Sequence, residues 1–350
     1  MANIRRLHPG VYIKDNLDVM EMTAKEFSDR TGISERTLSS IINGKGDITF
    51  EVAYKLSQYF DSSINYWTNL QTQYNLYLLE KSKENDIEEE WNLFKNVKKY
   101  LYDMNFLSKD SSKEESIYKS RALVGVNDLR LLRKKDSFVC LKEQHILKDY
   151  NYFYQIFWIA LALNEARKKN GIPFNKKLLL QSIEEIRGMT IKDSSEFYPR
   201  LQEIFTGCGI SFVLLPYLSK SNIYGATKWF SKDDVMLAIS NRGERADLFW
   251  FTLFHEISHV LMEHRRETLI NMKDNEDDEA DRMAAEMLIS KKEWDKFVNQ
   301  KYFTKVSIQR FADEIGIHPC IVLGRLHKEK RVPYNRFNNC FNLKYHISLN

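Results

Sequence analysis

Two histidines and a glutamate form the most informative group of residues in this sequence. They are His255, Glu256 and His259, in the pattern H-E-x-x-H directly after the apolar stretch 248–254. On a helix, residues four positions apart lie on one face, so two imidazoles at this spacing can bind one tetrahedral metal ion. The carboxylate of Glu256 falls beside them, where it can accept a proton from water that the metal activates. The pattern predicts a metal-dependent hydrolase site with His255 and His259 as ligands and Glu256 as general base.

A third ligand is needed to complete such a site, and the sequence offers several candidates. One zinc-protease pattern has a histidine six residues after the second motif histidine, but Arg265 stands there and His264 is one position away. An acidic helix, 276–289, offers carboxylates instead. Glu279 shares a face with two core-facing methionines, which favours it over His264 as the third ligand. The preceding acids are expected in a solvated first turn of this helix: Glu276, Asp277 and Asp278.

The elements that must position these residues indicate an α+β domain. The stretch 246–264 has no Pro or Gly and is expected as one buried helix. Short strands are expected at 210–215, 227–230 and 235–240, and further helices at 153–168, 176–187 and 195–205. We therefore predict a small sheet packed on the motif helix.

The first 75 residues have the pattern of a helical DNA-binding module. Helices are expected at 24–31, 35–42 and 50–60, each preceded by a Thr or Ser that can cap it. Gly32 ends the first of these helices, so the first two form a helix-turn-helix. The second helix of such a pair enters the major groove of DNA with its N-terminal residues foremost.

Residues spread over about 8–75 carry a family resemblance. They include His8-Pro9-Gly10, Thr23 to Phe27, Gly32-Ile33-Ser34, Ile41 to Lys45 and Trp67. In these residues the sequence resembles HigA-type antitoxins of the XRE helix-turn-helix class. The resemblance implies operator DNA binding, usually as a homodimer, with autorepression. By position, it implies that Ser34, Arg36, Thr37 and Ser40 face base edges or phosphates and that Lys45 faces a phosphate.

The charge of this module limits how it can bind DNA. Residues 1–75 hold eight Lys and Arg against nine Asp and Glu, a net charge of −1, within a chain whose net charge is +4. Because phosphate neutralisation usually supplies much of the affinity for DNA, we expect binding to depend on a few residues such as Arg36 and Lys45. A helical module used only for protein contact is the alternative.

The C-terminal part carries a second resemblance. Its residues include Gly225 to Trp229, Phe249 to His259, His264, Glu279-Ala280-Asp281, Ala284-Ala285 and Gly324 to His327. Over about 145–350 the sequence resembles ImmA/IrrE-type metallopeptidases, with Ser258 where the common residue is glycine. The resemblance implies a zincin-like fold, metal ligands His255, His259 and Glu279, and zinc or manganese as the metal. It also implies site-specific cleavage of a repressor or another regulator.

The domains are thus expected at 1–75 and 145–350, and the segment between them is less informative. Residues 76–144 are predicted as a helical linker, a sensor or a dimerisation region. Near the end of the chain, 307–315 and 319–330 form a second candidate helix-turn-helix. This pair either contacts DNA or closes the core of the metallopeptidase domain.

Composition favours a cytoplasmic protein without a membrane segment. The first residues lack the apolar core of a signal peptide, the stretch 152–163 is shorter than a membrane span, and the four cysteines form no C-x-x-C pair. Two functions remain. One is a DNA-binding regulator with an active metallopeptidase, in a toxin-antitoxin, mobile-element or stress-response setting, that cleaves a repressor or antitoxin partner. The other is an antitoxin or repressor whose peptidase-like domain is a non-catalytic sensor or partner-binding module.

Overall fold

The computed structural model of the protein describes residues 7–133, 149–169, 172–264, 275–337 and 339–345. Its contacts divide the chain into two compact units, residues 1–89 and 90–350. The predicted boundaries at 75 and 144 differ from this division. The segment 76–144 is shared between the two units, and its last part, 134–144, lies outside the described residues.

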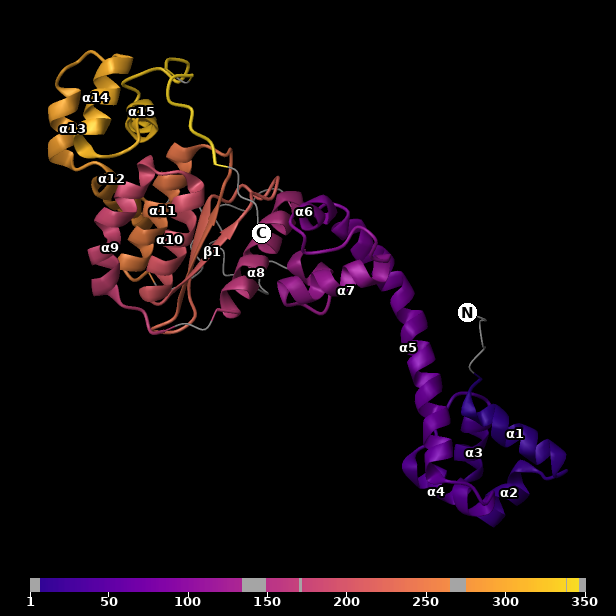
Figure 1. Cartoon of the computed structure of the whole chain (residues 1–350). Helices are drawn as coiled ribbons and strands as arrows, with labels where there is room; N and C mark the ends of the chain where they lie inside the picture. Colours follow the sequence, from indigo (N-terminus) through magenta and orange to yellow (C-terminus); the bar gives the residue numbers. More distant parts are fainter. Residues whose placement is uncertain (1–6, 134–148, 170–171, 265–274, 338, 346–350) are drawn as a thin grey trace. The chain divides into compact units, whose positions relative to one another are not determined.

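The first unit is a bundle of short helices. They are α1 (Pro9–Val19), α2 (Ala24–Thr31), α3 (Glu35–Ile42), α4 (Phe50–Tyr59) and the first part of α5 (Ile64–Phe94) (Figure 1). The side chains of Thr23, Ser34 and Thr49 accept hydrogen bonds from the backbone of the helices that follow them. Helices α2 and α3 have the predicted bounds, so the predicted helix-turn-helix pair is confirmed.

Apolar side chains from these helices fill the centre of the first unit. Gly10 lets α1 approach α3, because a Cβ at this position would lie 1.8 Å from the carbonyl oxygen of Ile41. At the start of α5, the buried ring of Trp67 packs with its centroid 5.5 Å from that of Phe60 and donates a 2.9 Å hydrogen bond to Ser62. The core of this unit therefore includes the first turns of α5.

The second unit combines helices with one small sheet. Its helices are α6 (Lys98–Asp103), α7 (Lys113–Val124), α8 (Asp149–Arg167), α9 (Lys176–Gly188), α10 (Ser194–Gly207), α11 (Ala246–Leu261), α12 (Asn275–Leu288), α13 (Lys291–Val298), α14 (Lys305–Ile315) and α15 (Pro319–Lys328), with 3₁₀ turns η1 (Leu129–Arg133) and η3 (Met189–Ile191). Its strands are β1 (Ile210–Leu215), β2 (Gly225–Trp229) and β3 (Val235–Ser240). The bounds of β1 and β3 are those predicted.

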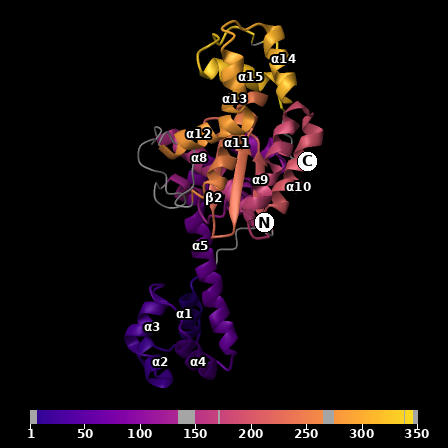
Figure 2. The ribbon, with the colours of Figure 1, turned by 90° about the vertical axis from the view of Figure 1, so that its left-hand side faces the viewer.

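The three strands form a mixed sheet in the order β1-β3-β2. β1 runs parallel to β3, with Ile210 opposite Val235, and β2 runs antiparallel to β3, with Trp229 opposite Val235. Helix α8 covers one face of the sheet, and α10 and α11 cover the other (Figures 1 and 2). All six residues of β3 are buried, because this central strand is covered on both faces. The predicted small sheet packed on the motif helix is confirmed.

The C-terminal helix pair α14 and α15 belongs to the core of the second unit. Gly316, in the left-handed region at φ 69°, ends α14 and permits the tight turn. The first turn of α15, which would have to enter a DNA groove, is buried instead, including Ile321 and Val322. It packs against α11. Of the two roles expected for this pair, the structure supports closure of the core. No helix among the described residues has the length and apolarity needed to cross a membrane.

A buried ion pair holds the end of α5 in the second unit. Glu90 is completely buried and accepts hydrogen bonds from the guanidinium of Arg121 in α7 and, at 2.8 Å, from the backbone N–H of Leu129. Three elements, α5, α7 and η1, are thus joined at one carboxylate. This contact joins the end of α5 to the second unit, which begins at residue 90.

Replacing Glu90 by Ala should destabilise the second unit by about 3–5 kcal/mol, because it leaves a charged guanidinium and a backbone donor without their acceptor. Urea unfolding followed by circular dichroism measures the effect. Glu115→Ala is the matched control, since Glu115 pairs with Lys119 on the exposed side of α7. Its unfolding midpoint should stay near that of the wild type, and equal losses in the two variants would contradict the role given to Glu90.

Candidate functional site

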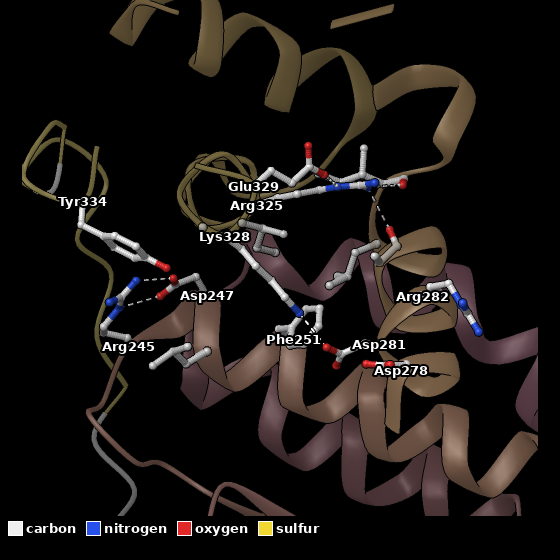
Figure 3. A pocket seen from close by; sticks show the side chains of 16 residues that line it. Arg245, Asp247, Phe251, Asp278, Asp281, Arg282, Arg325, Lys328, Glu329 and Tyr334 are labelled. Atoms are coloured by element: carbon white, nitrogen blue, oxygen red, sulfur yellow. Dashed lines mark hydrogen bonds and ion pairs between the residues drawn. The ribbon is translucent and has the colours of Figure 1, made fainter. Parts of the chain in front are cut away.

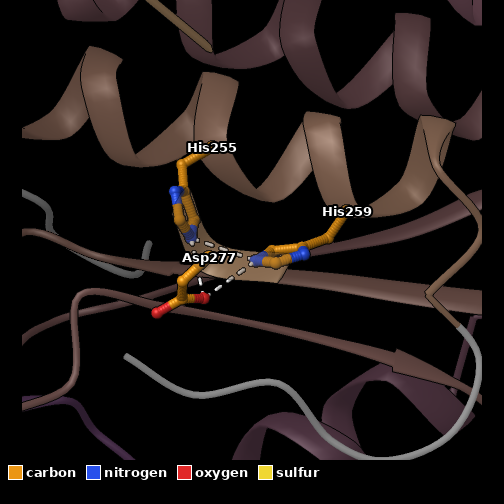
Figure 4. A group of neighbouring side chains, drawn as sticks. All are labelled: His255, His259 and Asp277. Atoms are coloured by element: carbon orange, nitrogen blue, oxygen red, sulfur yellow. Dashed lines mark hydrogen bonds and ion pairs between the residues drawn. The ribbon is translucent and has the colours of Figure 1, made fainter. Parts of the chain in front are cut away.

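Helix α11 places the two motif histidines at one point. His255 and His259 are four residues apart, and their Nε2 atoms lie 3.0 Å from one another (Figure 4). The helix is buried along most of its length, from Ala246 to Leu261, because it packs against the sheet, α12 and α15. The imidazoles are therefore held by a helix that has little freedom to move.

A carboxylate from α12 completes the group. The Oδ1 atom of Asp277 lies 3.7 Å from His255 Nε2 and 3.4 Å from His259 Nε2 (Figure 4). Ligand atoms bound tetrahedrally at 2.0–2.1 Å are separated by about 3.3–3.4 Å, so these spacings suit a single zinc-sized ion. Among the described residues, His255, His259 and Asp277 form a group that could hold a metal.

The structure does not bring Glu279 to this point. Its side chain is exposed, whereas Asp277, expected in the solvated first turn, faces the histidines. The reason is the phase of α12, whose buried face follows Ala280, Ala284 and Leu288. At about 100° per residue, Asp277 lies beside this face and Glu279 about 200° away from Asp277. The structure thus places Asp277, and not the predicted Glu279, beside the two histidines, and Arg265 lies outside the described residues.

Two further side chains orient the imidazoles. His255 Nδ1 is 2.9 Å from Asp281 Oδ1, and His259 Nδ1 is 2.8 Å from His264 Nδ1. His264 reaches this position because Glu263 adopts a positive φ of 56° and the His264 N–H donates to the carbonyl of His259. Hydrogen bonds at Nδ1 leave each Nε2 lone pair directed at the common point. The sequence treated His264 only as a weak candidate ligand and gave Asp281 no separate role.

The donors at this point are suited to a cation. Two imidazole nitrogens and a carboxylate oxygen converge, and three electron-rich atoms at this spacing repel one another unless a positive charge lies between them. Burial lowers the pKa of His255, but Asp277 and Asp281 outweigh this effect and raise it to about 10. Burial raises the pKa values of Asp277 and Asp281, but His255 and His259 at Asp277, and His255 and Lys328 at Asp281, lower them by more. The residues therefore fit a divalent metal such as zinc or manganese.

Glu256 lies buried next to the histidines, with 3% of its surface exposed. Thr227 of β2 donates a 2.6 Å hydrogen bond to Glu256 Oε2. Gly225 leaves room for this carboxylate, since a Cβ there would lie 2.7 Å from Oε1. Burial raises the pKa of Glu256, and the opposing attraction of His259 and His255 is weaker. A carboxylate with a raised pKa suits both acceptance and return of a proton near neutral pH.

The second candidate site is the exposed face of α3 in the first unit. Ser34, Arg36, Thr37 and Lys45 are exposed there, as predicted for contacts with DNA. Ser34 and Thr37 also hydrogen-bond one another across 2.8 Å at the N-terminus of α3.

Ser40 differs from the other predicted DNA contacts. It is half-buried, and its carbonyl oxygen accepts hydrogen bonds from the N–H groups of Lys45 and Gly46. This contact fixes the turn that carries Lys45. Two residues that the sequence did not indicate, Ser39 and Asn43, are exposed on the same helix face as Arg36, at i+3 and i+7.

Comparison with known proteins agrees with this geometry. The chain matches the helix-turn-helix family over residues 20–67. It is 38% identical over 82 residues to the HTH-type transcriptional regulator YddM of Escherichia coli (strain K12). These 82 residues are 23% of this chain and 85% of YddM. It is 39% identical over 70 residues to virulence-associated protein A' of Dichelobacter nodosus. These 70 residues are 20% of this chain and 61% of that protein. The chain thus spans about three fifths of that relative.

Two solved structures also match. One is an addiction module antidote protein of the HigA family from Coxiella burnetii, at 28% identity, with 25% of this chain and 96% of that chain covered and a TM-score of 0.24. The other is a putative antidote protein of a plasmid maintenance system from Nostoc punctiforme, at 30% identity, with 25% and 94% covered and a TM-score of 0.24.

The arrangement of α2 and α3 defines a helix-turn-helix protein. The chain belongs to the helix-turn-helix family of transcriptional regulators, and this membership rests on its first unit. The first unit is a DNA-binding module of this class.

Loss of Asp277 should weaken metal binding more than loss of Glu279. Asp277→Ala removes a carboxylate that points at the histidines. Loss of a side chain that only orients a ligand lowers metal affinity by about 10–100-fold, so we expect a larger fall in zinc affinity for Asp277→Ala. Competition with a chromophoric chelator measures the affinity of the full chain. Glu279→Ala is the control and should bind zinc like the wild type. The reverse order of affinities would restore Glu279 as the ligand.

Proposed function

We propose that the protein is a DNA-binding regulator whose second unit is a metal-dependent endopeptidase. The observation that carries this proposal is the convergence of His255, His259 and Asp277 on one point beside the buried carboxylate of Glu256. Zinc or manganese at this point supplies Lewis acidity toward water and toward a peptide carbonyl. The H-E-x-x-H pattern and the likeness to ImmA/IrrE-type metallopeptidases agree with this assignment.

The protein's own residues have separate roles in the proposed hydrolysis. Glu256 accepts a proton from the attacking water and later donates it to the leaving amine nitrogen, as a C–O bond forms and the peptide C–N bond breaks. Thr227, through its hydrogen bond, fixes the orientation of the Glu256 carboxylate. Asp281 and His264 hold the two imidazoles in position. These roles need no movement of the helices.

The partners follow from the two units. Operator DNA is the proposed ligand of the first unit, bound as a homodimer because a module of net charge −1 gains little from charge alone. A repressor, an antitoxin or a toxin is the proposed protein partner of the second unit. The likeness of residues 8–75 to HigA-type antitoxins supports a setting of this kind.

Glu256→Gln should keep the fold and the bound metal but abolish cleavage, since an amide cannot accept the proton. The full chain and its variant are co-expressed with the products of neighbouring genes, and fragments are detected by immunoblotting. Thr227→Val should give an intermediate loss, because it removes the hydrogen bond to the carboxylate but not the base itself.

One observation favours an alternative function. Glu256 is almost fully enclosed, which is expected for a metal-binding sensor or partner-binding module that carries out no hydrolysis. Metal binding by the wild type, with no fragments from either the wild type or Glu256→Gln, would support this alternative. Equal fragment yields from the two proteins would exclude Glu256 as the base.

On DNA, Arg36→Ala should cost about 1–3 kcal/mol of specific binding if Arg36 contacts a base. Lys45→Ala should instead weaken all sequences alike and reduce the salt dependence, as expected for a phosphate contact. Mobility shifts of the full chain on its own promoter, at several salt concentrations, measure both effects. Lys25→Ala, on α2, is the charge-matched control. Wild-type affinity in the Arg36 and Lys45 variants would contradict the assigned face.

A further inference from the structure

A cavity of about 690 Å³ lies among α11, α12 and α15, next to the metal-binding group (Figure 3). Its volume is in the range of small-molecule sites. Apolar side chains from all three helices line much of it, including Phe251, Leu288 and Ile321. Asp281 forms part of the wall, and its Oδ1 atom lies 2.9 Å from His255 Nδ1. The cavity and the histidine pair therefore share one carboxylate.

Most of the charges in the wall are already neutralised. Arg245 makes a two-point contact with Asp247. Arg325 donates to Glu329 and to the carbonyl of Ile289. The remaining wall charges on α12, Asp278 and Arg282, are exposed, opposite in sign and one turn apart.

Lys328 is the cation best placed to receive a ligand. Its ammonium donates one hydrogen bond, of 2.7 Å, to Asp281 Oδ2 and lies 4.3 Å from the centroid of the Phe251 ring (Figure 3). An ammonium has three N–H donors. The side chains of Lys328 and Asp281 are 56% and 37% exposed, and ion pairs of such exposure contribute little free energy. A competing anion can therefore replace Asp281 as the acceptor of the Lys328 hydrogen bond at a small cost in free energy.

We propose that the cavity binds a small amphipathic monocarboxylate and that this ligand controls the metal-binding group through Lys328 and Asp281. The carboxylate accepts hydrogen bonds from Lys328, and the apolar body lies on Phe251, Leu288 and Ile321. A single negative charge is specified, because Arg245 and Arg325 are already paired and Arg282 is exposed on α12. The control of the metal rests on the metal site proposed above, whereas the ligand site itself does not.

The direction of the control follows from the hydrogen bonds. A ligand that draws Lys328 away leaves Asp281 as a stronger acceptor for the N–H at His255 Nδ1. The Nε2 atom of His255 then becomes a better metal donor. The ligand should thus raise zinc affinity, and zinc should raise ligand affinity by the same factor.

The binding test uses the full chain, stripped of metal, with phenylbutyrate, indolepropionate and decanoate as probes and their primary amides as uncharged controls. Calorimetry and ligand-observed NMR measure Kd. We expect at least one carboxylate to bind, its amide to bind about tenfold more weakly, and Lys328→Met to weaken only the carboxylate by about 10–100-fold. Lys328→Arg should retain binding, Lys292→Met at an exposed position of α13 should leave it unchanged, and Ala285→Phe should fill the cavity and abolish it.

Two results would overturn the ligand site: none of the carboxylates binds, or Lys328→Met and Lys292→Met bind them equally. The same titrations are then repeated with zinc present. A lower carboxylate Kd in zinc supports the link to the metal, and zinc that binds without changing this Kd overturns it. A chain that binds neither zinc nor manganese but binds carboxylates through Lys328 refutes the proposed peptidase and supports the ligand site.

Discussion

Packing of α11 against α12 brings together the histidines and aspartates of the candidate site in the second unit. Helix α11 is enclosed by the sheet, α12 and α15, so its two histidines have a fixed position and spacing. Helix α12 meets it through small side chains, Ala280 and Ala284, which allow close approach of the two backbones. The carboxylates of Asp277 and Asp281, four residues apart on this helix, then reach the histidines from one side.

The burial of these charges constrains the surrounding residues. Charged groups inside a protein are tolerated only when each has a partner. Asp281 has two, His255 and Lys328, and Glu256 has the hydroxyl of Thr227. The absence of a side chain at Gly225 is part of the same arrangement, because any Cβ there would displace the Glu256 carboxylate. Residues on four elements, α11, α12, α15 and β2, are thus tied to one small polar group.

Much of this architecture is predictable from sequence, and the exceptions have physical causes. Capping residues and apolar periodicity define α2, α3, β1 and β3 to the residue, since these signals are local. The third residue of the candidate metal site is not predictable in this way. Four acids in a row, from Glu276 to Glu279, differ only in helix phase, and two positions along a helix turn a side chain to the opposite face. The pairing of His264 with His259 depends on a positive φ at Glu263, which no periodic pattern reveals.

The two units also differ in how far along the chain their contacts reach, and this has a consequence for synthesis on the ribosome. Among the described residues, the helix-turn-helix core draws on positions 12–70, so it can form early in translation. The enclosure of α11 needs Tyr345, whose hydroxyl accepts from Trp250 Nε1 across 95 residues, and a backbone bridge between Arg245 and Lys344. During translation, the histidine helix therefore emerges well before the segment that covers it. The nascent second unit exposes an apolar helix for that interval, and the risk of aggregation falls on this part of the chain.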